Sequence, residues 1–185
     1  DLILGALKPQ EGQITLDGVD ISTSYRGWHD KIGYIPQTIY MLDDTIRNNI
    51  AFGKKEGIND EDVWAALRQA QLDEFVESLE EGLDTVIGEA GVRLSGGQRQ
   101  ALTLLMATMV PPDLLLLDEH TAALDPGTAD KVLKLTQEII EKNHTTCLMV
   151  THNMQQALSM GNRTLMMDDG KIVLDVEGKE RENMT

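Results

Sequence analysis

The chain has 185 residues, a hydrophobic content of 41% and a formal charge of -15. This length and hydrophobic content suffice for one sizeable core with room for a small subdomain. The negative charge argues against nucleic acid or an anionic membrane surface as the main partner, because both would repel the chain. No apolar run approaches the roughly 20 residues that span a bilayer, and the first residues lack the basic region of a signal peptide. We therefore expect a cytosolic chain that does not insert into a membrane.

The first part of the chain predicts short elements, followed by a helical block. Residues 2–7 are apolar and end before a proline, which indicates the last turns of a helix. Residues 13–16 and 31–35 have the composition of short strands bounded by turn residues. Residues 60–79 then show the apolar spacing of a helix, so we expect a helical insert there.

The second part of the chain predicts helices that alternate with strands. Helices are expected at residues 95–109, 128–141 and 154–160, and strands at residues 114–117, 145–150, 164–167 and 171–174. Residues 114–117 are four leucines in a row, which is typical of a strand buried on both faces. The alternation predicts an α/β fold with a mostly parallel sheet. The charged tail, residues 177–185, is expected to fray.

A glycine-containing segment begins the helix expected at residues 95–109. It consists of Leu94, Ser95, Gly96, Gly97 and Gln98. A serine caps a helix, and glycines leave the first backbone N–H groups open to an anion. Taken alone, the segment favours an ordinary serine-capped helix start. Together with the acids and the histidine described next, it predicts a phosphate-binding helix end.

Two acids and a histidine follow two of the expected strands. Asp118 and Glu119 come directly after the leucines, and His152 follows the strand expected at residues 145–150. Ligands of open α/β sheets bind at the carboxyl ends of strands, so we expect these side chains at one edge. One acid can hold Mg²⁺ and the other can orient or deprotonate a water, while the histidine can contact a γ-phosphate. The remaining histidines lack this context and are expected to have ordinary surface or capping roles: His29, His120 and His144.

The ordered set of motifs resembles the ATP-binding domains of ABC transporters. Residues 94–98 resemble the signature motif, residues 114–119 the Walker B strand, and His152 the switch histidine. Residues 123–125 resemble the loop that touches the partner subunit, and Gln37 the glutamine that senses Mg²⁺, water and the transmembrane coupling helix. The resemblance covers nearly the whole chain.

The resemblance implies the following site residues. Catalytic roles fall to Glu119, His152 and Gln37; ATP contacts to Leu94, Ser95, Gly96, Gly97, Gln98 and Asp125; Mg²⁺ binding to Asp118 and Gln37. It also implies a RecA-like P-loop NTPase core formed by residues 1–37 and 110–185, with a helical subdomain at residues 38–109. ATP and Mg²⁺ are the implied cofactors. The implied partners are a second nucleotide-binding domain, arranged head to tail, and transmembrane domains at the cytoplasmic face of a membrane.

Different parts of the chain resemble different branches of the family. Residues 44–53 and 85–91 resemble export-type transporters, and the second segment resembles the loop that exporters use for coupling. Residues 101–108 and 118–121 resemble stand-alone ATPase subunits of import-type or uncharacterised systems. We therefore hypothesise a chimera or natural recombinant joined near residues 97–100. A non-transport ABC protein of DNA repair or translation is disfavoured by the exporter-like segments and by the negative charge.

The chain contains no P-loop pattern of glycine, four residues, glycine-lysine and then serine or threonine. In family members that loop precedes the helix whose end is expected at residues 2–7, so the sequence is expected to start a few residues late. The strand leading into the loop would lie beside residues 145–150, and we expect an unpaired edge with an exposed apolar face there. An aromatic residue for adenine is also missing, because Tyr25 and Trp28 are not placed for that contact. We expect very weak ATP binding and no turnover; the alternative is a truncated or engineered module without enzymatic activity.

Overall fold

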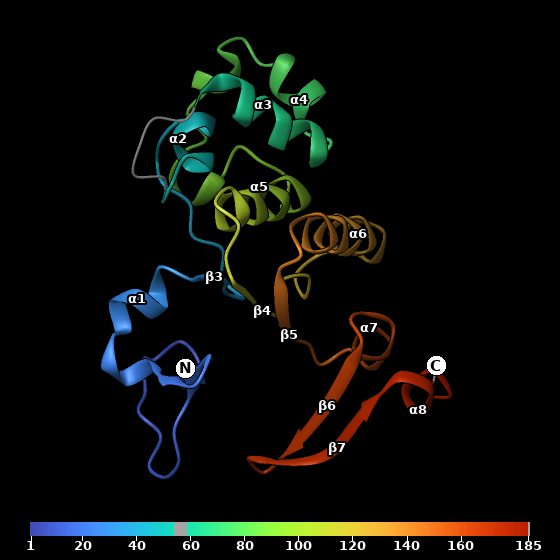
Figure 1. Ribbon diagram of the computed structural model, residues 1–185. Coiled ribbons are helices and arrows are strands. Elements are labelled where there is room, and N and C mark those ends of the chain that lie inside the picture. Colours follow the sequence, from blue (N-terminus) through green and yellow to red (C-terminus); the bar gives the residue numbers. More distant parts are fainter. Residues whose placement is uncertain (54–58, 185) are drawn as a thin grey trace.

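A three-stranded parallel sheet lies at the centre of the molecule (Figure 1). The computed structural model describes residues 1–53 and 59–184. The strands of the sheet, in spatial order, are β3 (Ile32–Ile35), β4 (Leu114–Asp118) and β5 (Thr146–Val150). The register pairs Ile35 with Leu117, and Asp118 with Val150. The carboxyl ends of all three strands therefore meet at one edge.

Two long helices, α5 (Gly96–Thr108) and α6 (Pro126–Asn143), lie next to each other against this sheet (Figure 1). α5 begins with a capping box, in which the Ser95 hydroxyl accepts from the Gln98 N–H and the Gln98 side chain accepts from the Ser95 N–H. α6 begins with Asp125 as its N-cap and a proline at its first turn, where the missing N–H costs nothing. Both helices start where the sequence places capping residues.

A block of short helices covers the far side of α5 (Figure 1). It contains α2 (Ile46–Ile50), α3 (Asp60–Gln69) and α4 (Asp73–Glu77). The helical insert expected over residues 60–79 consists of two helices, because Gln71 adopts a left-handed φ of 55° that separates α3 from α4. This break lets Leu67, Leu72 and Val76 all point into the core.

One hydrophobic core joins the helical block to the sheet. Ile35 of β3 and Leu117 of β4 belong to the same buried cluster as Leu67 of α3, Leu104 of α5 and Ile139 of α6. Gly33 permits this close packing, since a Cβ at that position would lie 2.8 Å from the carbonyl oxygen of Ala107 in α5. The division of the chain into a core and a helical subdomain stays a prediction.

The N-terminal part forms small elements beside the sheet. They are β1 (Thr15–Leu16), β2 (Val19–Asp20), and α1 (Tyr25–His29), with β1 and β2 paired as an antiparallel hairpin. Residues 2–7 form turns, so the predicted helix end is wrong: Gly5 takes a φ of 73°, which interrupts helical hydrogen bonding. Single 3-10 turns occur at Ile21–Thr23, Gly82–Asp84 and Glu89–Gly91.

The outer edge of β5 has no strand partner among the described residues. The strands expected after it, β6 (Arg163–Asp168) and β7 (Lys171–Glu177), pair only with each other as an antiparallel hairpin. The expected parallel sheet is thus confirmed in β3, β4 and β5, with the expected unpaired edge at β5, while β6 and β7 form a separate antiparallel sheet. Leu148 and Val150 of β5 are exposed, as the sequence predicted, and the hairpin also exposes Leu165, Met167 and Ile172.

Residues 177–184 of the C-terminal tail form regular structure, and Thr185 lies outside the described residues. After α7 (Met154–Ser159) and the β6–β7 hairpin, the chain forms α8 (Gly178–Glu182). The predicted fraying is wrong because Arg181 is buried and hydrogen-bonded to β6 and α7. Within the described part of the chain, no helix combines the length and apolarity needed to cross a bilayer.

The tight contact at Gly33 predicts that a larger residue at this position destabilises the fold. Gly33→Ala should lower the free energy of unfolding by about 1–3 kcal/mol, because the added methyl group meets backbone and proline atoms that cannot move aside. Urea denaturation measures the change. Gly127→Ala in the first turn of α6 is the matched control, since its added Cβ meets only ordinary contacts, and it should change stability by less than about 0.5 kcal/mol. Equal effects of the two substitutions would contradict the packing argument.

Candidate functional site

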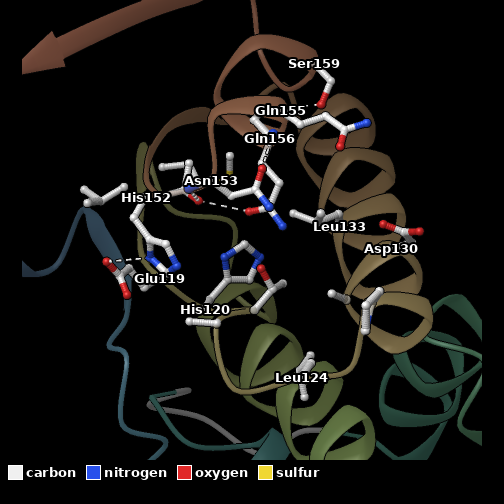
Figure 2. A pocket seen from close by; sticks show the side chains of 17 residues that line it. Glu119, His120, Leu124, Asp130, Leu133, His152, Asn153, Gln155, Gln156 and Ser159 are labelled. Atoms are coloured by element: carbon white, nitrogen blue, oxygen red, sulfur yellow. Dashed lines mark hydrogen bonds and ion pairs between the residues drawn. The ribbon is translucent and has the colours of Figure 1, made fainter.

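Three residues predicted as catalytic lie together at the carboxyl edge of the sheet. The Gln37 Nε2 group donates to Glu119 Oε2 at 3.1 Å. On the other side of the same carboxylate, His152 Nδ1 lies 3.2 Å from Oε1, as Figure 2 shows. Glu119 thus bridges a residue that follows β3 and a residue that follows β5.

The backbone around Glu119 explains this placement. The Glu119 N–H donates to the carbonyl of Val150 at 2.9 Å. This hydrogen bond extends the pairing of β4 with β5 by one residue beyond the end of β4. Glu119 itself has a φ of 48°, a left-handed conformation that is strained for a residue with a Cβ. The strand therefore ends at this residue. The Glu119 side chain is 27% exposed and that of His152 is 72% exposed, so solvent reaches both.

Asp118 lies one residue earlier, at the end of β4. Its Oδ2 atom accepts from the Tyr34 hydroxyl at 3.5 Å. Burial, together with the neighbouring Asp118, raises the pKa of Tyr34, so the phenol stays protonated as a donor. No cluster of three or more His, Cys, Asp or Glu side chains able to hold a metal occurs among the residues described. The oxygen atoms of Asp118 and Gln37 fit Mg²⁺, which commonly takes one or two protein ligands and completes its shell with water and phosphate.

The glycine-containing segment lies where α5 meets the start of α6. A Cβ on Gly97 would lie 2.6 Å from Thr128 Cγ2, and one on Gly96 would lie 3.1 Å from Leu124 Cδ2. A larger residue at either position would clash with these side chains, so glycine is required for packing as well as for leaving backbone N–H groups accessible. Ser95 Oγ accepts from the Gln98 N–H at 3.2 Å, and its own proton is left to donate elsewhere.

Two other residues predicted to contact ATP, Leu94 and Asp125, also stabilise the fold of this chain. The Leu94 side chain is buried in the core, so any ligand contact must come from its backbone. Asp125 caps α6 by accepting from the Thr128 N–H at 3.1 Å, and hydrogen bonds from Thr128 lower the pKa of Asp125. The predicted nucleotide contacts of both residues stay predictions.

His120 has a position that sequence reasoning missed. Its ring is only 4% exposed and lines a cavity of about 410 Å³ together with Glu119 and His152 (Figure 2). Its Nε2 atom lies 3.3 Å from Thr136 Oγ1, which donates its own proton to Val132 O, so Nε2 is the donor. Burial lowers the pKa of His120 to about 4. The sequence around His120 gives no signal of this burial. The ring is buried because α6, a segment distant in sequence, packs against it.

The parallel sheet, with acids at its carboxyl edge and a glycine-containing helix start nearby, is typical of an α/β nucleotide-binding protein and is consistent with the P-loop NTPase fold. A family model described as ABC transporter matches residues 1–122. A tyrosine transport ATP-binding protein of Clostridioides difficile is 37% identical over 193 aligned residues, covering 100% of this chain and 76% of that protein. The chain belongs to the ABC transporter family.

Other relatives include proteins much longer than this chain. The uncharacterized ABC transporter ATP-binding protein YwjA of Bacillus subtilis is 42% identical over 78% of this chain and 25% of its own length. An ATP-dependent lipid A-core flippase of Haemophilus ducreyi is 38% identical over 88% of this chain and 28% of its own length. The structure of a bacterial Atm1-family ABC exporter with ATP bound superposes with a TM-score of 0.83 at 30% identity, covering 95% of this chain and 30% of the exporter chain. This chain therefore spans about three tenths or less of these three proteins.

The burial of His120 predicts that the stability of the fold depends on pH. The pKa of His120 falls from 6.5 to about 4 on folding, so the unfolded chain binds the proton more readily between these values. Stability should therefore fall as the pH drops from about 6.5 to about 4, by at most about 1.4 kcal/mol per pH unit from this residue. His120→Gln, which keeps a donor for Thr136, should remove that part of the pH dependence in urea denaturation. His144→Asn, at an exposed left-handed helix end, should leave it unchanged; equal pH profiles for wild type and His120→Gln would contradict the assignment.

Proposed function

We propose that this chain is the ATP-binding motor part of an ABC transporter and that it couples ATP binding and hydrolysis to movement of a substrate across a membrane. The supporting observation is the carboxylate of Glu119, which bonds Gln37 on one side and His152 on the other. Membership of the ABC transporter family indicates ATP hydrolysis as the reaction. Gln37, Glu119 and His152 are the residues that would carry it out.

In this proposal Glu119 is the general base. Its carboxylate, held between two donors at the open edge of the sheet, orients an attacking water and accepts its proton. His152, when protonated, donates through Nδ1 to Glu119 and through Nε2 to an oxygen of the γ-phosphate. Gln37 holds the second carboxylate oxygen and so limits rotation of the base.

Asp118 and Gln37 would hold Mg²⁺ through oxygen atoms. When bound, the ion neutralises charge on the transferring phosphoryl group. Asp118 is suited to this role because it adjoins Glu119 at the strand end and is only partly buried. Tyr34, as a donor to Asp118, keeps one carboxylate oxygen in a defined direction.

The signature segment acts on a nucleotide held mainly by a second nucleotide-binding domain. The Ser95 hydroxyl proton and the N–H groups of Gly96 and Gly97 form the donor set, at the positive end of a 13-residue helix. Its packing against Leu124 and Thr128 ties this donor set to the loop that ends at Asp125. A head-to-tail pair of such domains is the arrangement that this proposal requires.

The transmembrane partner binds over the two exporter-like segments. These segments are joined by the hydrogen bonds from Ile46 N to Thr85 O and from Ile87 N to Asp44 O, and by an ion pair between Arg47 and Asp84. Large apolar side chains stand exposed around them: Tyr40, Leu42, Phe52, Val86 and Val92. Such an exposed apolar patch is typical of a protein interface. With such a partner, the chain would lie at the cytoplasmic face of the membrane.

The relatives are named for different transported molecules. One relative is named for tyrosine transport and others are named as lipid A-core flippases. Both kinds align across the proposed junction near residues 97–100, and the hypothesis of two ancestries stays a prediction. The transported substrate is selected by transmembrane domains in this proposal.

The 185 residues, taken by themselves, should bind Mg-ATP weakly, because their sequence lacks the P-loop pattern, which supplies a lysine and an amide nest for the β- and γ-phosphates. Trp28 supplies no adenine contact, since it is buried and its indole N–H donates to the Ile3 carbonyl. Isothermal titration with Mg-ATP should give a dissociation constant in the millimolar range or no measurable heat. Micromolar binding would contradict this expectation.

A complementation experiment tests the catalytic proposal. A strand, P-loop and helix start from a family member, joined ahead of Asp1, should confer Mg-dependent ATP hydrolysis on the chain. Glu119→Gln in the joined protein should reduce the rate about 100-fold or more while retaining ATP binding, because the base is lost and the fold is kept. Phosphate release and nucleotide titration measure the two effects. ATP binding without hydrolysis in the parent joined protein would support the non-enzymatic module, and equal rates for both proteins would exclude Glu119 as the base.

A further inference from the structure

The short helix α7 follows His152 directly and has no buried side chain of its own. Helices are normally held in place by an apolar face packed on a core, and a six-residue helix has little stability without tertiary contacts. Ala157 and Leu158 are half-buried and give α7 only partial apolar packing, so polar contacts at its ends contribute strongly to its position. His152 itself is 72% exposed, so packing around its ring does not hold it either.

The N-terminal end of α7 is tied to the residues on both sides of His152. Asn153 Oδ1 accepts from the Gln156 N–H at 3.1 Å, and Thr151 Oγ1 accepts from the Asn153 N–H at 3.1 Å. The Thr151 hydroxyl donates to Gln156 Oε1 at 3.0 Å. Because these bonds join the loop to the first turn, a shift of α7 carries His152 with it.

The C-terminal end of α7 is held by Arg181 of α8. Arg181 is 8% exposed, and its Nη2 group donates to the carbonyls of Met160 at 2.5 Å and Ala157 at 3.4 Å. Its Nε group donates to Thr164 Oγ1 at 2.8 Å, and that hydroxyl donates to the Ala157 carbonyl at 2.6 Å. A cation at a helix C-terminus satisfies carbonyls that have no partner within the helix and interacts favourably with the helix dipole. Arg181 thus links α7, β6 and α8.

We propose that Arg181 is a positioning residue, which braces α7 from its C-terminal end and thereby keeps His152 within reach of Glu119. The proposal rests on the function assigned above to the Glu119–His152 contact. Arg181 acts through the helix, because its own hydrogen bonds lie at the opposite end of α7 from His152. The C-terminal segment is therefore part of the support for the site.

Arg181→Gln in the full 185-residue chain tests this brace. Amide hydrogen exchange at Ala157 and Met160 should become at least about tenfold faster, because a buried charge-assisted network is lost. The ring nitrogen NMR signals of His152 should move toward those seen in Glu119→Gln, which serves as the reference for a lost contact. Arg181→Lys should restore part of both effects, since it keeps the charge without the planar fork.

Arg163→Gln is the matched control. Arg163 is a neighbouring arginine on β6, but its guanidinium pairs with Asp175 of β7 and is 54% exposed. This substitution should leave the exchange rates of α7 and the His152 signals as in the wild type. Thr164→Val gives a second test that keeps the arginine, and it should also speed exchange at Ala157.

The outcomes separate the two proposals. If Glu119→Gln moves the His152 signals and Arg181→Gln leaves them in place, the positioning role is overturned while the catalytic contact stands. Slow exchange of α7 in both Arg181→Gln and Thr164→Val would overturn the brace itself. If Glu119→Gln leaves His152 unaffected, the contact beneath the proposed function fails, and the positioning role fails with it.

Discussion

The register of β3, β4 and β5 is the constraint on which the rest of the structure depends. Gln37, Glu119 and His152 are far apart in sequence, and they meet only because three parallel strands end at the same edge. A slip of one residue in any strand would turn its side chains to the opposite face and separate the cluster. The buried leucines of β4 oppose such a slip, since Leu115 and Leu117 lie in the core. Packing in the core and chemistry at the edge are thus set by the same pairing.

Glycines contribute to this arrangement mainly by allowing neighbouring helices and strands to approach closely. Gly33 admits the backbone of α5 to the surface of β3, while Gly96 and Gly97 admit Leu124 and Thr128 to the start of α5. The same absence of a Cβ that leaves donor groups accessible to an anion also brings the signature segment against α6. A substitution in this segment would change its packing against Leu124 and Thr128 and, in the proposed function, its binding of phosphate.

Polar contacts hold the parts that the hydrophobic core does not reach. The core cluster extends from the helical block through α5 to β4 and α6, whereas α7 has no buried residue. On that side the chain relies on Arg181, Thr164 and the capping bonds around Asn153. The apolar edge of β5 lies between these two regions and has no strand partner in the described residues. The segment that carries His152 is therefore held by polar contacts, whereas β3, which leads to Gln37, packs in the hydrophobic core.

The sequence by itself determined the α/β class, the leucine strand, the capped start of α5 and the polar residues that follow two strands, Asp118, Glu119 and His152. These features follow from local spacing, because capping, alternation and strand-end polar residues are properties of short segments, whereas Gln37 came from the family resemblance alone. Only the tertiary structure decided the contacts of Glu119, the break at Gln71, the separate β6–β7 hairpin and the burial of His120 and Arg181. Each of these depends on which distant segment packs against the residue, and that choice is made by the free energy of the whole fold.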